Sequence, residues 1–239
     1  MLAQNYTTLI AIFLLTALAH SQEAKPSKAS LSIRAFMHDP SSTAAQMYLK
    51  DEKGHMVKLN LTPEDLGMPQ LTIPVDGSLI LFNTAGVDPK NPESIVAAQV
   101  AVPKNMQRAI VIIIPGPANS SPAYRMVLID DSAEAFPPGA SKVLTLVSFD
   151  TALEAGEHKV LCSPGKVTNV AAVKKLDPYN MAQTDFYFKE NDAWTVFSEC
   201  KMKYIDAYRQ IFIAYIRPGS KAPELTTLID LMPRAASAK

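Results

Sequence analysis

The stretch Arg108–Pro117, RAIVIIIPGP, and the stretch Tyr208–Ser220, YRQIFIAYIRPGS, determine the fold class that this sequence predicts. Both are dense in β-branched and aromatic residues, which favour strands over helices. Each contains a Pro-Gly pair, a turn signal at which a strand ends. A Leu-Ile-Asp triplet follows each of them, at Leu128–Asp130 and at Leu228–Asp230. The chain is therefore expected to consist of two similar β-rich halves.

Most other apolar segments are short, have the same strand-like composition and are separated by turn residues. In the first half we expect strands at Leu31–Met37, Ala45–Lys50, His55–Leu61, Gln70–Val75, Ser78–Asn83, Ile95–Val102, Arg108–Ile114 and Tyr124–Asp130. In the second half we expect them at Lys142–Ser148, Glu157–Ser163, Lys166–Val173, Thr184–Lys189, Ala193–Cys200, Tyr208–Ile216 and Leu225–Leu231. Turns such as Asp76-Gly77 supply the positive φ of tight hairpins, which predicts antiparallel pairing.

Two segments also fit a helix. Pro92–Val102 is rich in alanine, and Lys201–Ile216 places apolar side chains at helical spacing. We keep Ile95–Val102 among the expected strands, and we prefer a strand for Arg209–Ile216 because it is rich in β-branched and aromatic residues. A short helix immediately before Arg209 remains open.

The fold class predicted is all-β, with two β-sandwich-like (immunoglobulin-like) modules of antiparallel strands. Pro137-Pro138-Gly139 interrupts the strand pattern, so we place the boundary close by, with an N-terminal module at 31–133 and a C-terminal module at 134–234. Residues 235–239 are expected to be a frayed tail. The matching order of motifs fits a tandem duplication, but coincidence between β-rich sequences is the alternative, and both stay open.

The N-terminus has the pattern of an export signal. Leu9–Ala19 is an apolar run that ends in a small-x-small motif, although Met1–Thr8 lacks the usual lysine or arginine. The run is too short to cross a hydrocarbon core of ~30 Å as a helix. We therefore expect a signal peptide at 1–21, a flexible leader at 22–30 and no membrane span after cleavage. The predicted location is the periplasm, the cell surface or the extracellular space.

The composition excludes two classes of protein. Hydrophobic residues make up 48% of the chain and charged residues 19%, which is enough apolar side chain for a globular core and excludes a disordered protein. Lysine plus arginine and aspartate plus glutamate both number 23. Such a balance creates no overall field for nucleic acid, so no nucleic-acid partner is expected.

The chain has only two cysteines, Cys162 and Cys200. An exported protein lives where disulfides persist, so these two residues are a possible disulfide. Two buried thiols on different strands are the alternative, because connectivity cannot be read from sequence.

The sequence contains no recognisable catalytic or cofactor motif. The nucleophile elbow, the zinc-protease motif, the dinucleotide-binding motif, the P-loop and the EF-hand loop are all absent. No two histidines stand at metal-ligand spacing. We therefore predict no catalytic residue, no metal site and no cofactor.

The strongest candidate for binding is the aromatic segment Thr184–Phe197, TDFYFKENDAWTVF. Strand alternation places Phe186 and Phe188 on one face and Tyr187 on the other, and it places Trp194 opposite Phe197. One face must belong to the core. Tyr187 and Trp194 are the candidate binding residues of the other face, although aromatic residues in strands more often serve packing.

The run Tyr124–Ser148, with Asp130–Gly139 (DDSAEAFPPG) at its centre, is followed by Ser163–Val170, the Trp194 hairpin and Tyr208–Ile216. In this order of elements the chain resembles uncharacterised secreted bacterial proteins over most of its length. The resemblance implies export and an all-β fold of two segments behind a signal peptide. It implies no activity, cofactor or catalytic residue.

Three functions fit these observations. The first is a non-enzymatic exported protein that contacts another envelope or surface protein through strand edges or loops. The second is a carbohydrate-binding module in which Tyr187 and Trp194 stack on a glycan. The third is an enzyme, which would need acid and base groups that converge in one cleft, and the linear sequence shows no such convergence.

Overall fold

The computed structural model describes residues 30–38, 46–62, 64–86 and 95–231, and these residues form sixteen strands. The N-terminal module contains β1 (Leu31–Met37), β2 (Tyr48–Lys50), β3 (Met56–Lys58), β4 (Gln70–Thr72), β5 (Ser78–Phe82), β6 (Val96–Ala101), β7 (Arg108–Pro115) and β8 (Tyr124–Asp130). The C-terminal module contains β9 (Ser141–Thr145), β10 (Thr151–Ala155), β11 (His158–Cys162), β12 (Val167–Val170), β13 (Met181–Glu190), β14 (Ala193–Lys203), β15 (Arg209–Tyr215) and β16 (Glu224–Asp230). The predicted all-β class is confirmed. The expected signal peptide, tail and nearly all of the leader lie outside the described residues.

Each of the fifteen predicted strand segments overlaps an observed strand. One strand, β10, was not predicted, because its sequence Thr-Ala-Leu-Glu-Ala is poor in β-branched residues. The helical alternatives are wrong: β6 crosses the alanine-rich segment, and Lys201–Ile216 forms the end of β14, a turn and β15. No helix in the described part of the chain is long and apolar enough to cross a membrane.

The strands form four sheets of four strands each. Sheet A has the order β4-β1-β7-β8 and sheet B the order β3-β2-β5-β6. Sheet C has the order β12-β9-β15-β16 and sheet D the order β11-β10-β13-β14. Adding eight to each strand number converts sheet A into sheet C and sheet B into sheet D. The two modules therefore share one topology.

The pairing is antiparallel except in the middle of sheets A and C. There β1 runs parallel to β7, and β9 runs parallel to β15. These two pairs are exceptions to the antiparallel pairing that the sequence predicted. Hairpin signals report only on strands that are neighbours in sequence, and about 70 residues separate the partners in each parallel pair.

The two modules differ in one detail of register. The backbone N–H of Asp131 donates to the carbonyl of Arg108 over 3.1 Å, and Arg209 pairs with Asp230 in sheet C. Asp131 is therefore the structural equivalent of Asp230. The two Leu-Ile-Asp triplets seen in the sequence are therefore offset by one residue, so Asp130 does not correspond to Asp230.

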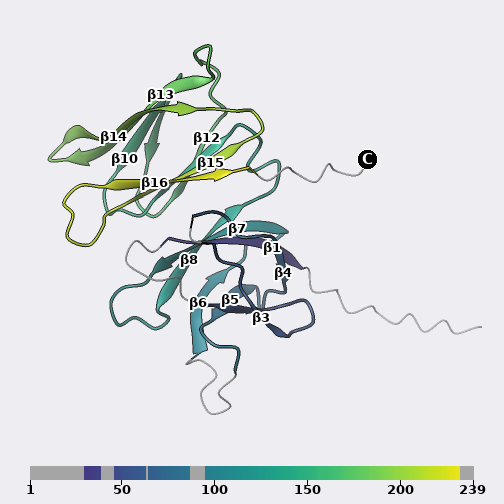
Figure 1. Ribbon diagram of the computed structural model, residues 1–239. Helices are drawn as coiled ribbons and strands as arrows, with labels where there is room; N and C mark the ends of the chain where they lie inside the picture. Colours follow the sequence, from purple (N-terminus) through teal and green to yellow (C-terminus); the bar gives the residue numbers. More distant parts are fainter. Residues whose placement is uncertain (1–29, 39–45, 63, 87–94, 232–239) are drawn as a thin grey trace, which may run out of the picture.

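The core is divided into three apolar layers between four stacked sheets (Figure 1). One layer lies between sheets A and B, one between sheets A and C, and one between sheets C and D. Val111 and Ile113 of β7 face sheet B, whereas Ile110 and Ile112 face sheet C. Both faces of β7 are thus buried, and the same holds for β15. This two-sided burial explains why both strands read as continuous apolar runs.

The two cysteines lie too far apart to form the disulfide that we considered. Cys162 is on β11 and Cys200 is on β14, the two opposite edges of sheet D, and both are free. Three strand spacings of ~4.8 Å alone separate them by about 14 Å, and their offset along the strands adds to this distance. A disulfide requires Cα atoms within about 7 Å.

Reducing agent should therefore leave the melting temperature of the native protein unchanged. In a thiol titration, the fully buried Cys162 should react with a maleimide only after unfolding. A drop of several degrees on reduction would contradict this assignment.

Candidate functional site

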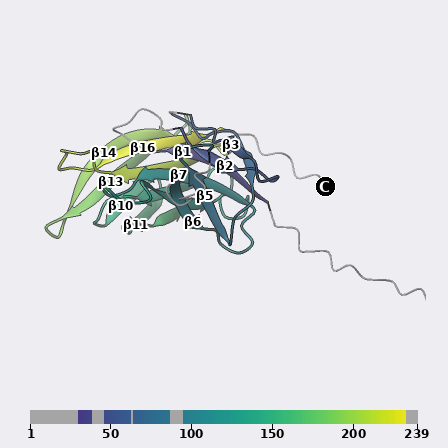
Figure 2. The same cartoon turned by 90° about the horizontal axis from the view of Figure 1, so that it is seen from below.

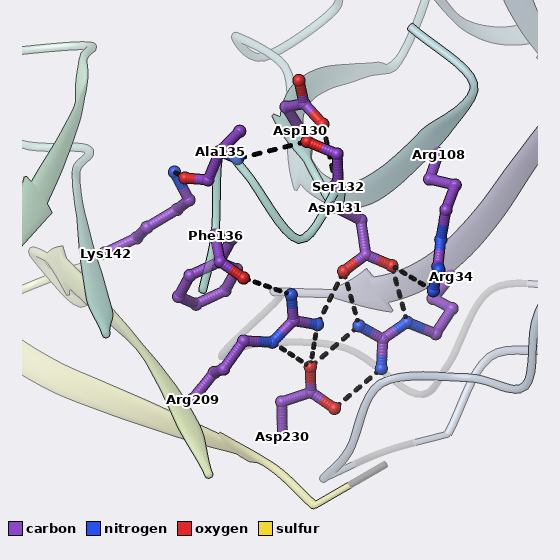
Figure 3. Close-up of polar contacts among 10 residues, drawn as sticks. All are labelled: Arg34, Arg108, Asp130, Asp131, Ser132, Ala135, Phe136, Lys142, Arg209 and Asp230. Atoms are coloured by element: carbon purple, nitrogen blue, oxygen red, sulfur yellow. Dashed lines mark hydrogen bonds and ion pairs between the residues drawn. The ribbon is translucent and has the colours of Figure 1, made fainter. Parts of the chain in front are cut away.

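The most concentrated group of charges lies between the two modules (Figure 3). It consists of two arginines and two aspartates, one of each from either module: Arg34, Asp131, Arg209 and Asp230. All four side chains are nearly inaccessible to water. We call this group the intermodule ion cluster.

Arg34 of β1 binds both aspartates. Its Nε and Nη2 donate to the carboxylate of Asp131 over 3.2 and 3.0 Å, and its Nη1 and Nη2 donate to the carboxylate of Asp230, each over 2.8 Å. The planar guanidinium group suits such paired donation to carboxylates. Arg34 therefore connects its own module to the C-terminal one.

Arg209 of β15 makes the reciprocal connection. Its Nη2 donates to Asp131 over 2.6 Å and also to Asp230, and its Nε donates to Asp230 over 2.9 Å. Its Nη1 donates to the carbonyl oxygen of Phe136 over 3.0 Å, and its guanidinium carbon lies 4.3 Å from the centre of the Phe136 ring. Each carboxylate is thus shared by both arginines.

The corner between the modules places Asp131 and Phe136 beside Arg209. Asp130 accepts a hydrogen bond from the backbone N–H of Ser132, and the Ser132 hydroxyl accepts one from the N–H of Ala135. The N–H of Phe136 donates to the carbonyl of Ser132, which closes a turn. These short-range bonds are the local role of the segment Asp130–Gly139 that stood out in the sequence.

The charged state of the cluster is strongly favoured. Burial would raise the pKa of Asp230, but hydrogen bonds from Arg34 and Arg209 outweigh burial and lower that pKa from 3.8 to about 2. Burial opposes the charge of Arg34 as well, yet the two aspartates raise its pKa above the ordinary value. Arg34 and Asp230 are therefore ionised at neutral pH.

The cluster is suited to holding the modules together and not to chemistry. A general acid or base must exchange protons with a substrate, and a catalytic arginine must have free donors. Here the donors face carboxylates and the carbonyl of Phe136, and solvent is excluded. The sequence analysis missed the cluster, because its hydrogen-bonded partners lie up to 196 residues apart. The one local signal was a charged residue inside an apolar strand, Arg34 in LSIRAFM.

The predicted binding residues lie on the opposite side of the C-terminal module, on the outer face of sheet D. Phe186 and Phe188 point into the core, and Phe197 packs against both with ring centroids 6.0 and 6.2 Å away. Tyr187 and Trp194 point outward, as alternation predicted, and Trp194 is 46% exposed. The structure thus places these two aromatic side chains on the same face of neighbouring strands.

Tyr187 belongs to a row of apolar side chains that crosses all four strands of sheet D. The pairing register aligns Leu161 with Ala152, Ala152 with Tyr187, and Tyr187 with Val196. Leu161 is 57% exposed and Val196 44% exposed. We call these four residues together with Trp194 the outer row.

In the described part of the chain, no three His, Cys, Asp or Glu side chains are grouped so that they could hold a metal ion. An open pocket of about 420 Å³ lies beside β6, β8 and the loop that leads into β8. Its walls contain no carboxylate and no histidine, so it lacks an acid–base pair.

Comparison with models of known protein families and with curated proteins finds no match for this chain.

Replacing Arg34 by methionine should destabilise the protein by about 3–5 kcal/mol, because two buried carboxylates lose their main partner. Arg108 provides the matched control. It lies 3.7 Å from Asp131 but is 49% exposed, so Arg108→Met should cost less than about 1 kcal/mol. Urea unfolding of both variants measures the difference. Equal losses of unfolding free energy in the two variants would show that burial of the cluster contributes nothing to stability.

The free energy of unfolding should also depend on pH through Asp230. Its pKa is lower in the folded protein than the value of 3.8 expected when unfolded, so its contribution is present above pH 4 and is lost as the pH falls towards 2. The contribution is roughly 2 kcal/mol. Thermal melts between pH 7 and pH 2 should therefore show a flatter dependence for Asp230→Asn than for the unmodified protein. Asp192→Asn, at an exposed hairpin position, should keep the original slope.

Proposed function

We propose that this protein is an exported, non-enzymatic binding protein that contacts another envelope or cell-surface protein through the outer face of sheet D. The single observation that carries the proposal is the exposed outer row. Export itself is inferred from the sequence pattern of residues 1–21.

Exposed apolar side chains are ordinary when they are scattered, but a contiguous patch commonly marks an interaction site. The outer row is contiguous across a whole sheet, and it contains the one tryptophan of the chain. Tryptophan and tyrosine are enriched at the centres of protein interfaces, because they contribute a large contact area with few rotatable bonds. The chemistry of the row therefore fits a protein partner.

The charges beside the row indicate what kind of surface the partner presents. Asp185 and Glu199 face each other directly across β13 and β14, an arrangement of like charges that is unfavourable in isolation. Lys159 on the same face is paired with Glu154 over 2.8 Å. The carboxylates of Asp185 and Glu199 thus lie next to the apolar row, although Lys189 and Lys201 lie on the same face. A partner with apolar side chains flanked by lysine or arginine complements it.

The architecture supports this use of the surface. Sheet D is one of the two outermost layers of the stack, and the ion cluster and the apolar layer between sheets A and C hold the modules in one arrangement. A surface that is already ordered loses little conformational entropy on binding.

The proposal is tested by capture from envelope extract of the producing cell. The double variant Leu161→Asp/Val196→Asp adds charge to the outer row at exposed positions and should lose at least tenfold of the bound partner, measured by quantitative mass spectrometry. Leu71→Asp is the control, because Leu71 is 48% exposed on β4 of the other module. Capture that is unaffected by the double variant would refute the proposal, and so would capture that Leu71→Asp removes equally.

A carbohydrate-binding function is the second candidate, and the observation in its favour is the shared outward face of Tyr187 and Trp194. Exposed aromatic rings can stack on the apolar face of a sugar ring. In the same capture experiment, retention of glycan without a stoichiometric protein, lost on Trp194→Ala, would favour this alternative.

A further inference from the structure

We propose that two copies of this chain associate through β14, in antiparallel register centred on Cys200, so that two copies of sheet D form one eight-stranded sheet. The proposal concerns the edge of the sheet, whereas the function proposed above concerns its outer face.

β14 is an open edge. It is the last strand of sheet D, it has eleven residues, and among the residues that the structure describes no further strand pairs with it. Figures 1 and 2 both show the β13–β14 hairpin at the periphery of the C-terminal module. An unpaired edge presents N–H and C=O groups to any strand of complementary register.

The hydrogen-bond pattern shows which residues of β14 point to the open side. The backbone N–H of Tyr204 donates to the carbonyl of Asn180 over 2.8 Å. In an antiparallel ladder, bonded and non-bonded pairs alternate, so the main chains of Ser198, Cys200 and Met202 face β13. Those of Glu199 and Lys201 therefore face outward.

The free part of the edge is short and has a defined centre. On one side, the carbonyl oxygen of Lys203 already accepts a hydrogen bond of 3.0 Å from the side chain of Gln210. On the other side, the register between β13 and β14 shifts near Phe197, which bends the strand. The segment that remains is Ser198–Met202, and Cys200 is its middle residue.

The charges select the same centre. With the twofold axis at Cys200, Glu199 of each copy lies opposite Lys201 of the other, and this gives two cross-strand ion pairs. A shift of the centre to Glu199 places two glutamates opposite each other, and a shift to Lys201 places two lysines opposite each other. Like charges directly opposite are unfavourable, so of these three registers only the one centred on Cys200 is free of them.

The association would also create a larger surface. Directly opposite residues of an antiparallel pair point to the same side of the sheet, so the outer faces of both copies lie side by side. Val196 of one copy is offset from Val196 of the second copy by eight residues, or about 26 Å at 3.3 Å per residue. The two outer rows then form one bivalent platform.

The experiment is sedimentation or light scattering of the purified protein and of two charge-reversal variants. The unmodified protein should be a dimer. Glu199→Lys and Lys201→Glu should each raise the dimer dissociation constant at least about tenfold, because each turns both ion pairs into repulsions. An equimolar mixture of the two variants should recover the dimer as a heterodimer. Lys159→Glu, on the opposite edge of sheet D, should leave the dimer intact.

A second measurement tests the register. Diamide, which is reduced as it oxidises two thiols to a disulfide, should cross-link the unmodified protein and Cys162→Ser into a covalent dimer but should not cross-link Cys200→Ser, since residues at a non-bonded pair lie close enough for a disulfide. A monomeric protein would overturn the proposal. A dimer insensitive to both charge reversals would overturn it as well, and neither result bears on the partner of the outer face.

Discussion

The two-sided burial of β7 and β15 is the constraint on which the rest of this structure depends. A sandwich module normally buries one face of each sheet and leaves the other to solvent. Here the central strands of sheets A and C are apolar on both faces, so neither module can be exposed on that side without a large cost in hydration. The two modules must stack, and the four-layer arrangement follows. An apolar layer alone tolerates sliding, however, because hydrophobic contact is not directional.

The intermodule ion cluster fixes the relative position of the two modules, which the apolar layer alone does not. Equivalent positions in the two modules hold Arg34 and Lys142, Arg108 and Arg209, and Asp131 and Asp230. The cluster uses an asymmetric selection from these pairs. Lys142 instead binds the carbonyl of Ala135 and the side chain of Asn169, and Arg108 stays at the rim. A buried charge that loses its partner is expensive, so the network is satisfied in only one relative placement of the modules.

Features that depend on neighbouring residues could be predicted from the sequence, whereas features that depend on distant segments could not. Strand positions and the facing of Phe186, Tyr187 and Trp194 followed from alternation, which depends on the local chain alone. The parallel pairing of β1 with β7 and the meeting of Arg34 with Asp230 depend on segments far apart in sequence, and no local pattern reports them. Cys162 and Cys200 were candidates for pairing on the basis of compartment, which says nothing about strand order. The strand β10 was missed because tertiary pairing overrode a weak local preference.

The groups that are available to bind a partner lie at the C-terminal end of the stack, in sheet D. In the layer between the modules, carboxylates and guanidinium groups are matched to each other, so that layer has little left to offer a partner. In sheet D the balance is reversed: the outer face has apolar side chains in water, and the edge β14 has backbone groups with which no other strand of the described residues pairs. Charged side chains on an edge normally discourage pairing with other chains. On β14 the alternation of Glu199 and Lys201 disfavours the registers centred on either of these residues relative to the one centred on Cys200, so the side chains that discourage non-specific pairing also favour one register.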